Sequence, residues 1–435
     1  MAGIFGVASE EGCIRDALSG VFYLQNRSEE YCGLAWKTSG GELKNCTHKG
    51  LVKQGFVRGN FDSEKGSYAI ASVSGGREPV SELSKKGGVI LCMDGNLFNY
   101  SEMKKNLLEL GESFSGYHNP EEISDAVLIS KLIARAPSVV RGIKDLVFQM
   151  KGDFALAVLT PEGIYAARGW GRKPLILGEK DGAYAVSSES VAFINTGFKI
   201  VRDVEPGEVV LLNSEGINFI AQFDLSPIKY GTFEWIYTAH PASVIDGKSV
   251  ELVRNKIGAL MAERHPIDAD LVSPIPNSGR CHANGFANRS KIPYLEVFKK
   301  FDYSGRSFTP NTLKEQNEVA DEKLIPVKEL IKDKKIIIVD DSIVKGNQTR
   351  KQTQRLKALG AKEVHAIIAC PPLVGVCKYG KSLKCVEDCI ANQMSLEDIR
   401  LTRGLDGLHF ADVDIIEEAI GIPREKLCLG CWGID

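Results

Sequence analysis

The stretch 335–360, KIIIVDDSIVKGNQTRKQTQRLKALG, constrains the fold more than any other part of the chain. Its first apolar run predicts a buried strand, because a short β-branched run suits a sheet that is covered on both faces. Asp340 and Asp341 follow the strand, and a turn and a predicted helix that ends at Gly360 come next. Such an order is typical of a parallel α/β sheet, whose ligands lie beyond the carboxyl ends of the strands.

The residues at this strand end indicate phosphate and sugar binding. The free N–H groups at the start of the predicted helix suit a phosphate, and the helix dipole adds to the attraction. The carboxylates of Asp340 and Asp341 suit sugar hydroxyls or a Mg²⁺ ion that is held together with phosphates. The alternative is an acidic pair that only ends a strand and caps a helix.

The segment VDDSIVKG resembles the phosphoribosyl-pyrophosphate (PRPP) motif of type I phosphoribosyltransferases, in the version of the glutamine PRPP amidotransferase family. The resemblance implies that the acidic pair holds the ribose hydroxyls and that the following loop holds the 5′-phosphate. That loop departs from the family, which usually has hydroxyl residues after the glycine. The residues that the resemblance assigns to PRPP are Ser278, Gly279, Arg306, Asp340, Asp341, Ser342, Lys345, Gly346, Asn347, Gln348 and Thr349.

The composition bounds the class of protein. A chain of 435 residues predicts two domains of ordinary size. The formal charge of −2 gives no reason to expect nucleic acid or an anionic membrane as a partner. No apolar stretch is long enough to span a bilayer, and no signal segment opens the chain, so we expect a cytoplasmic protein. Eleven cysteines favour thiol or metal chemistry over a disulfide framework.

The N-terminal half predicts stacked, mostly antiparallel sheets with helices outside, because short strands and glycine turns alternate in it. Its opening, MAGIFG, and the segments YLQNR, MDGNLFNY and SDAVL resemble the glutaminase domain of the same family. The fold class that this implies is α/β with two domains. Residues 1–228 would form an N-terminal-nucleophile-type αββα four-layer domain, and residues 229–435 a type I phosphoribosyltransferase domain with a mostly parallel sheet.

Three positions depart from the glutaminase pattern. Ala2 stands where the family has its cysteine nucleophile, and a methyl group cannot attack an amide. Ser74 stands where the family has an arginine that binds the glutamine carboxylate, and a hydroxyl cannot replace that charged fork. Asp94 takes the place of the oxyanion-hole asparagine, and a carboxylate repels a developing negative charge. The three losses together predict an inactive glutaminase site.

The second half contains further segments of the family. Ser278 and Gly279 follow a predicted buried strand, where small residues let the backbone approach a pyrophosphate; a plain strand-to-helix turn is the alternative. Residues 312–323 correspond to a loop that folds over PRPP in the family. Here Glu318 and its acidic neighbours weaken the attraction for pyrophosphate, unless this is only a charged surface loop. The family also implies a homo-oligomer.

Cysteines near the C-terminus indicate a possible metal centre. Cys428 and Cys431 form a CxxC pair, whose spacing lets both thiolates face one metal. Some family members carry a [4Fe–4S] cluster on four cysteines, and Cys377, Cys428 and Cys431 match three of those positions. The fourth position is Gly231, so Cys281, Cys385 or Cys389 would have to complete the set. Zinc and unligated thiols are the alternatives.

Two functions follow from these observations. The first is an amidophosphoribosyltransferase-like enzyme of purine nucleotide synthesis that uses PRPP, Mg²⁺ and ammonia or another amine, but not glutamine. Lys345 and Arg306 would offset charge as the bond to pyrophosphate breaks. The second is a non-catalytic nucleotide-binding regulator or partner subunit derived from that enzyme.

Overall fold

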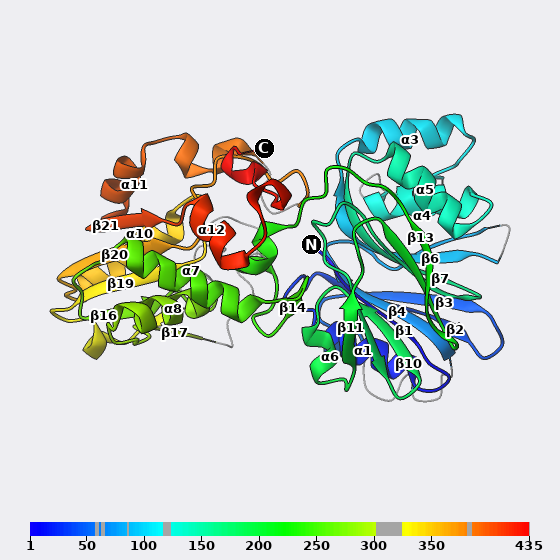
Figure 1. Ribbon diagram of the computed structural model, residues 1–435, viewed down its shortest axis with the longest axis horizontal. Coiled ribbons are helices and arrows are strands. Elements are labelled where there is room, and N and C mark those ends of the chain that lie inside the picture. Colours follow the sequence, from blue (N-terminus) through cyan, green and yellow to red (C-terminus); the bar gives the residue numbers. More distant parts are fainter. Residues whose placement is uncertain are drawn as a thin grey trace.

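The computed structural model describes residues 1–56, 61, 66–84, 87–115, 123–301, 324–380 and 385–434. Two lobes lie side by side, with the chain running from the first into the second (Figure 1). The division expected at residues 228/229 falls in the connection between β13 and η2. Among the described residues, no helix combines the length and the apolar composition that a membrane crossing requires.

The first lobe consists of two antiparallel sheets that pack face to face. The strands are β1 (Gly3–Ala8), β2 (Tyr31–Thr38), β3 (Leu43–Lys49), β4 (Gly66–Ser74), β5 (Val80–Glu82), β6 (Val89–Leu97), β7 (Gly152–Thr160), β8 (Gly163–Arg168), β9 (Ile176–Lys180), β10 (Ala183–Ser187), β11 (Lys199–Asp203), β12 (Glu208–Asn213) and β13 (Gly216–Gln222). The sheet orders are β11-β9-β10-β1-β4-β2-β3 and β13-β12-β8-β7-β6-β5. Ile4, Ile70, Ile90 and Leu159 belong to the buried layer between the sheets, which excludes water from both inner faces.

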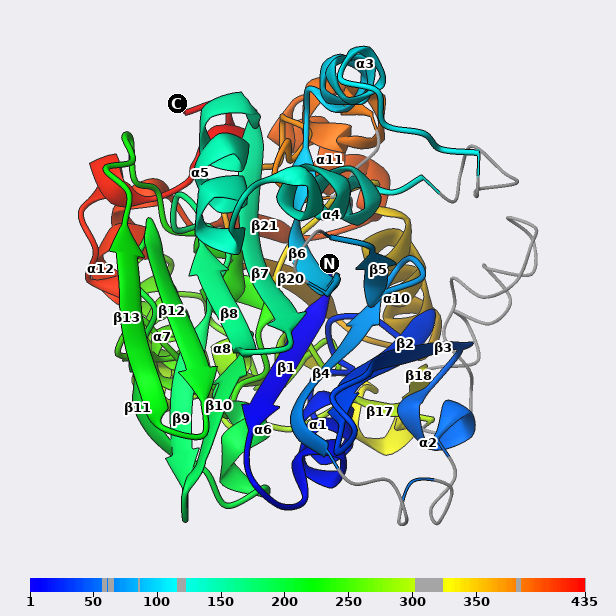
Figure 2. The same ribbon diagram turned by 90° about the vertical axis from the view of Figure 1, so that its right-hand side faces the viewer.

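Helices cover the outer faces of both sheets (Figure 2). They are α1 (Cys13–Phe22), α2 (Val52–Gly55) and α6 (Val191–Ile194) on the first sheet and α3 (Tyr100–Glu109), α4 (Asp125–Arg135) and α5 (Val139–Gln149) on the second. Helix α4 is buried over most of its length and packs on β5 and β6. The predicted four-layer αββα architecture is therefore confirmed.

The second lobe is built on a parallel sheet, as predicted. Its elements are η2 (Glu234–Thr238), β14 (Val244–Ile245), β15 (Lys248–Ser249), α7 (Val250–Arg264), β16 (Leu271–Pro274), α8 (Arg280–Ser290), β17 (Phe298–Lys300), β18 (Leu324–Pro326), η3 (Lys328–Leu330), β19 (Lys335–Asp340), α10 (Asn347–Ala358), β20 (Glu363–Ile368), η4 (Val386–Asp388), η5 (Ile390–Asn392), α11 (Leu396–Arg403), β21 (Gly407–Phe410), α12 (Val413–Ile420), η6 (Arg424–Lys426) and η7 (Gly430–Trp432). The sheet order is β16-β19-β20-β21, with Ile336 opposite both Leu271 and Val364.

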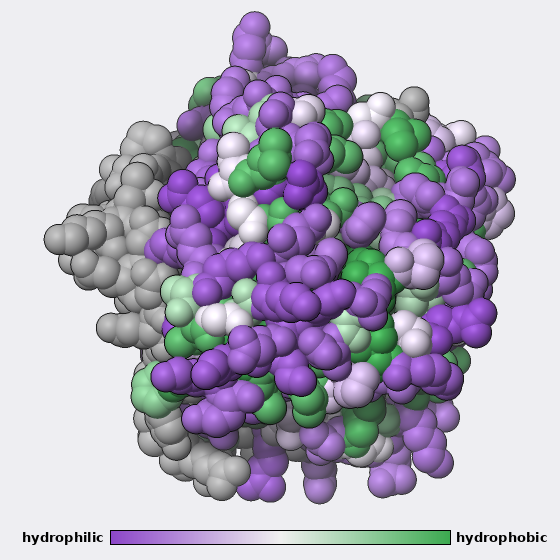
Figure 3. All heavy atoms as spheres, turned by 90° about the vertical axis from the view of Figure 1, so that its left-hand side faces the viewer, coloured by the Kyte–Doolittle hydropathy of each residue, from purple (hydrophilic) through white to green (hydrophobic). Residues whose placement is uncertain are grey.

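Strand β19 is central in this sheet, and its apolar residues are buried because helices cover both faces. Helix α8 packs on β16 and β19, whereas α10 and α11 pack on β20 and β21. The outer face of this lobe is mainly hydrophilic, with small separate hydrophobic areas (Figure 3). The carboxyl ends of β16 and β19 thus lie next to each other, and each leads into a loop and a helix.

The two lobes are joined by polar contacts as well as by the chain. The last residues return to the junction, where Tyr230 and Leu427 form a parallel bridge. Asn96 donates to the carbonyl of Lys378 at 2.6 Å, and the Arg172 guanidinium stacks 3.7 Å from the Tyr379 ring centroid. Residues from β6 and from the turn after β8 therefore hold the segment before η4.

Helices α7 and α8 approach each other so closely that only glycine fits at two positions. A Cβ on Gly258 would lie 1.9 Å from the His282 carbonyl oxygen, and one on Gly285 would lie 1.9 Å from the Asn255 carbonyl oxygen. We expect Gly258→Ala to cost about 1–3 kcal/mol, because the gain in helix propensity is smaller than the cost of pushing two backbones apart. Urea denaturation measures this change.

Gly40→Ala is the matched control, because the nearest atom to a Cβ there is Thr38 Oγ1 at 3.7 Å. That variant is expected to stay within about 0.5 kcal/mol of the parent protein. An unchanged or raised urea midpoint for Gly258→Ala would contradict the close approach of the two helices.

Candidate functional site

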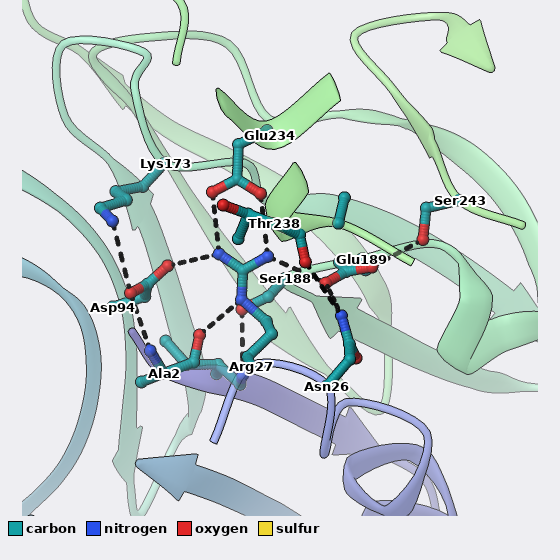
Figure 4. Close-up of polar contacts among 12 residues, drawn as sticks. Ala2, Asn26, Arg27, Asp94, Lys173, Ser188, Glu189, Glu234, Thr238 and Ser243 are labelled. Atoms are coloured by element: carbon teal, nitrogen blue, oxygen red, sulfur yellow. Dashed lines mark hydrogen bonds and ion pairs between the residues drawn. The ribbon is translucent and has the colours of Figure 1, made fainter. Parts of the chain in front are cut away.

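A buried cluster of charges occupies the predicted glutaminase site, with the Arg27 guanidinium at its centre (Figure 4). Arg27 donates to Asp94 at 2.8 Å, to Glu189 at 2.9 Å and to both oxygens of Glu234 at 3.0 Å. Its Nε donates to the carbonyl of Ala2 at 2.7 Å. The Arg27 side chain is fully buried, so every donor of the guanidinium is used inside the protein.

Asp94, which the sequence places at the oxyanion position, is held by two cations and a backbone amide. Its Oδ1 accepts from the N–H of Ala2 at 2.9 Å and lies 3.7 Å from Nζ of Lys173, while Oδ2 accepts from Arg27. Burial alone would raise the pKa of Asp94, but Lys173 and Arg27 hold it well below its ordinary value. The carboxylate is therefore ionised, and both oxygens point at partners rather than into an open site.

The same cluster joins the two lobes. Glu189 follows β10, whereas Glu234 belongs to η2 in the second lobe. Glu189 also accepts from the N–H of His240 at 2.7 Å and from the Ser243 hydroxyl at 2.8 Å. Burial would lower the pKa of Arg27, but its three carboxylate partners raise it well above the usual value. Arg27 thus stays charged and ties the first strand to the second lobe.

Polar residues at the ends of β4 and β6 and at the start of α4 are bound within the protein. Ser74 is buried, and its hydroxyl donates to the carbonyl of Gly76 at 2.6 Å. Asp125 begins α4 and accepts from the N–H of Leu97 at 3.2 Å, and Asn96 is bound to the carbonyl of Lys378. Each of these polar side chains contacts backbone of the protein itself.

The second predicted site lies at the carboxyl ends of β16 and β19. Ser278 donates from its hydroxyl to Asp340 Oδ1 at 2.9 Å, which joins the two strand ends. Ser342 donates to Asp341 Oδ2 at 2.6 Å. Burial and the neighbouring Asp341 carboxyl raise the pKa of Asp340 well above its ordinary value. Two close carboxyl groups that share a buried position favour a bound proton, a cation or a hydroxyl donor between them.

Small residues let two loops approach this acidic pair. A Cβ on Gly279 would lie 2.0 Å from the Val339 carbonyl oxygen, so only glycine fits beside β19. Gly346 precedes α10 in the left-handed region, with φ of 66°. Asn347 and Gln348 are exposed and Thr349 is buried. One group of predicted residues thus comes together at these strand ends, namely Ser278, Gly279, Asp340, Asp341 and Ser342. Gly346 precedes the neighbouring helix α10, and residues 347–349 form its first turn.

Of the predicted PRPP residues, Lys345 forms an ion pair and Arg306 lies outside the described residues. Lys345 Nζ lies 2.7 Å from Asp388 Oδ1, so its charge is partly offset by an acid of η4. Arg306 and the predicted covering loop at 312–323 lie outside the described residues. The charge that these residues would bring to the site stays a prediction from the sequence.

The cysteines do not form a recognisable metal centre. Within the described ranges, no group of three or more His, Cys, Asp and Glu side chains is arranged to hold a metal ion. Cys377 and Cys428 are partly exposed, whereas Cys431 is buried in η7. The structure gives the [4Fe–4S] prediction no support.

Comparison with known families assigns the two lobes. Residues 66–195 match the glutamine amidotransferase domain family, and residues 247–399 match the phosphoribosyl transferase domain family. Fold and sites therefore define a protein that joins an amidotransferase-type domain to a phosphoribosyltransferase domain.

Relatives of the same length share both domains. The chain is 32% identical to amidophosphoribosyltransferase of Methanocaldococcus jannaschii, over 99% of this chain and 96% of that protein. It is also 32% identical to the Bacillus subtilis enzyme, over 99% of this chain and 92% of that one. The chain belongs to the amidophosphoribosyltransferase family of purine biosynthesis.

Solved structures agree with this assignment. The glutamine PRPP amidotransferase of B. subtilis complexed with ADP and GMP superposes with a TM-score of 0.90 at 30% identity, covering 99% of this chain and 96% of that one. A structure described as the allosteric regulatory enzyme of purine biosynthesis also gives a TM-score of 0.90, at 31% identity, with 99% and 95% coverage. The match spans both lobes.

Several residues of the charge cluster escaped the sequence prediction. The sequence motifs assign no role to Lys173, Glu189 or Glu234, and they contain Arg27 only as part of the segment YLQNR. Arg27 lies 67 residues from Asp94 and 207 residues from Glu234 in the chain. A motif of neighbouring residues cannot identify partners that are so far apart in the chain. The one available signal was the acidic residue at position 94, which requires a counterion once it is buried.

We expect Arg27→Met to lower the free energy of unfolding by about 3–5 kcal/mol, because it leaves buried carboxylates without their counterion. Without Arg27, burial raises the carboxylate pKa values above those of the unfolded chain. The stability deficit is therefore largest at pH 8 and narrows as the pH falls toward 5, where the carboxyls take up protons. Urea denaturation at both pH values measures this difference.

Arg289→Met provides the control, because Arg289 pairs with Glu263 on the exposed surface. That change is expected to cost no more than about 1 kcal/mol, with little dependence on pH in this range. If Arg27→Met behaved like Arg289→Met, the cluster would not be the structural centre that its geometry indicates.

Proposed function

We propose that this protein transfers the phosphoribosyl group of PRPP to ammonia or another amine and does not use glutamine. The observation that supports the inability to use glutamine is the ionised, buried Asp94 at the oxyanion position, bound to Ala2 and Arg27. Phosphoribosyl transfer is supported by the family and by the proximity of Ser278, Asp340 and Ser342 at one edge of the parallel sheet.

A glutaminase of this kind needs a nucleophile and a donor for the oxyanion. Ala2 supplies neither a thiol nor a hydroxyl, so no covalent intermediate can form there. An oxyanion beside Asp94 would face a carboxylate at close range instead of a hydrogen-bond donor. The cations Arg27 and Lys173 do not compensate, because Asp94 and its acidic neighbours already use them.

Phosphoribosyl transfer requires positioning and charge stabilisation rather than a protein nucleophile. The amine nitrogen forms a bond to ribose C1 while the bond from C1 to pyrophosphate breaks, and pyrophosphate leaves with the electron pair. Asp340 and Asp341 would hold the ribose hydroxyls, and Ser278 with the backbone at Gly279 would hold pyrophosphate. The close carboxyl oxygens of the acidic pair fit a hard divalent cation, and Mg²⁺ would offset the charge of the leaving pyrophosphate.

A second function is a nucleotide-binding regulator or partner subunit without turnover. The ion pair between Lys345 and Asp388 favours it, because it reduces the positive charge next to a developing pyrophosphate anion. The related B. subtilis enzyme was solved with ADP and GMP, so nucleotides are the ligands to test first. Nucleotide binding without pyrophosphate release would identify this function.

Pyrophosphate release from PRPP tests the proposal directly. With Mg²⁺ and ammonia we expect steady release, and with glutamine in place of ammonia we expect none above background. Asp340→Asn combined with Asp341→Asn is expected to reduce release to background, because amides do not bind Mg²⁺ and sugar hydroxyls as carboxylates do. Asp333→Asn, in a surface turn of the same lobe, is the matched control and should retain activity.

The outcomes separate the two functions. Release with glutamine would contradict the inactive glutaminase, and release that survives in the double variant would remove the acidic pair from the site. If neither amine source gave release while nucleotides bound, the enzyme proposal would be wrong and the regulator proposal would stand.

Restoring the nucleophile alone is not expected to restore glutaminase activity. In Ala2→Cys the thiol returns, but Asp94 still opposes the oxyanion and Ser74 still cannot bind the glutamine carboxylate. We expect no glutamate formation from glutamine, measured with a coupled glutamate assay, and unchanged pyrophosphate release with ammonia. Glutamate formation by Ala2→Cys would show that Asp94 does not block the reaction.

A further inference from the structure

A buried arginine of α11, Arg403, lies against the start of α10, and none of the predicted functions uses it. Arg403 is the last residue of α11, and only 9% of its surface is exposed. Its Nε lies 2.8 Å from the position that a Cβ on Gly346 would take. The guanidinium is therefore pressed against the loop that precedes α10, at the end where the helix N–H groups are free.

The donors of Arg403 are largely unused. Among the described residues, its Nε has no hydrogen-bond partner, although it is buried. Nη2 makes one long contact of 3.4 Å with the Lys345 carbonyl oxygen. A buried guanidinium normally has its five donors satisfied, because unpaired polar groups are costly away from water. The unused Nε thus indicates a missing acceptor at this loop.

The charge of Arg403 is also uncompensated. Within the described part of the chain, no ion pair joins Arg403 or Arg350 to a carboxylate, whereas Arg27 and Arg168 each have acidic partners. Burial lowers the pKa of Arg403, and the positive charge of Arg350 lowers it further. Two guanidinium groups and a helix N-terminus thus bring positive charge to one place, an arrangement that an anion stabilises.

We propose that Arg403 is a phosphate-binding residue, which together with Arg350 and the first N–H groups of α10 holds a phosphate monoester at Gly346 and the first turn of α10. The proposal rests on the proposed function, because it assigns this phosphate to the ribose 5-phosphate end of the substrate. Asn347 and Gln348, in the first turn of α10, are neutral, so the positive charge that would attract the phosphate comes from the arginines. A guanidinium fork suits phosphate oxygens in geometry as well as in charge.

A purely structural role for Arg403 makes a different prediction. As a support for the loop, it would affect every ligand of the site equally and would lower the stability of the ligand-free protein. As a phosphate ligand, it affects the phosphate at α10 and leaves a pyrophosphate at Ser278 and Gly279 unchanged. Two probes therefore distinguish these roles, namely ribose 5-phosphate and magnesium pyrophosphate.

The experiment measures calorimetric binding of both probes to the full chain and to Arg403→Met. We expect Arg403→Met to weaken ribose 5-phosphate binding about tenfold or more, as the loss of a charged hydrogen bond requires, and to leave pyrophosphate binding unchanged within about twofold. Arg400→Met is the matched control on the same helix, because Arg400 pairs with Glu397 instead. Arg403→Gln replaces the methionine variant if that variant does not fold.

Each outcome decides the proposal. Equal binding of ribose 5-phosphate by the parent protein and Arg403→Met, or an equal loss for both probes, would overturn it. Parent protein that binds neither probe would overturn this inference and the proposed function together. Ribose 5-phosphate binding that depends on Arg403, in a protein that releases no pyrophosphate from PRPP, would support the phosphate site and reject the transferase.

Discussion

The buried Arg27 guanidinium joins both sheets of the first lobe to the second lobe. It bonds to the backbone at the start of β1, to Asp94 in the opposite sheet and to Glu234 in the second lobe. These three elements have no other common neighbour among the contacts described above. Because the cation is fully buried, water cannot substitute for these partners. One side chain thus fixes two sheets and a lobe junction relative to each other.

This cluster also explains how a carboxylate is accommodated at position 94. A carboxylate at position 94 would be costly in a buried site without cations, and Arg27 with Lys173 removes that cost. Both oxygens of Asp94 and every donor of the Arg27 guanidinium contact groups of the protein itself. An oxyanion site needs preorganised donors that are free to bind the substrate, and Arg27 has no donor left for that purpose. These contacts instead join Asp94 to the second lobe through Arg27.

The sequence predicts the parts of the structure that local patterns specify. The strand before Asp340 is predicted from a run of adjacent apolar residues. The helix after it is predicted to end at Gly360, because glycine commonly terminates helices. Neither Arg27 nor Arg403 could be assigned a role in advance, since their partners are distant in the chain and unmarked by any motif. Arg403, for example, lies 58 residues from Lys345.

The two ends of the second site differ in charge, and this difference would orient the phosphoribosyl ligand that we propose for it. Asp340 and Asp341 end β19 and attract hydroxyls or a metal ion, whereas Arg403 and Arg350 make the start of α10 positive. A sugar that carries a phosphate at one end and free hydroxyls at the other has the complementary polarity. Reversing the ligand would place the phosphate against carboxylates and would leave the buried guanidinium without an acceptor. If the proposed site binds this substrate, the charges on one strand end and one helix start would thus favour one orientation of the substrate over the other.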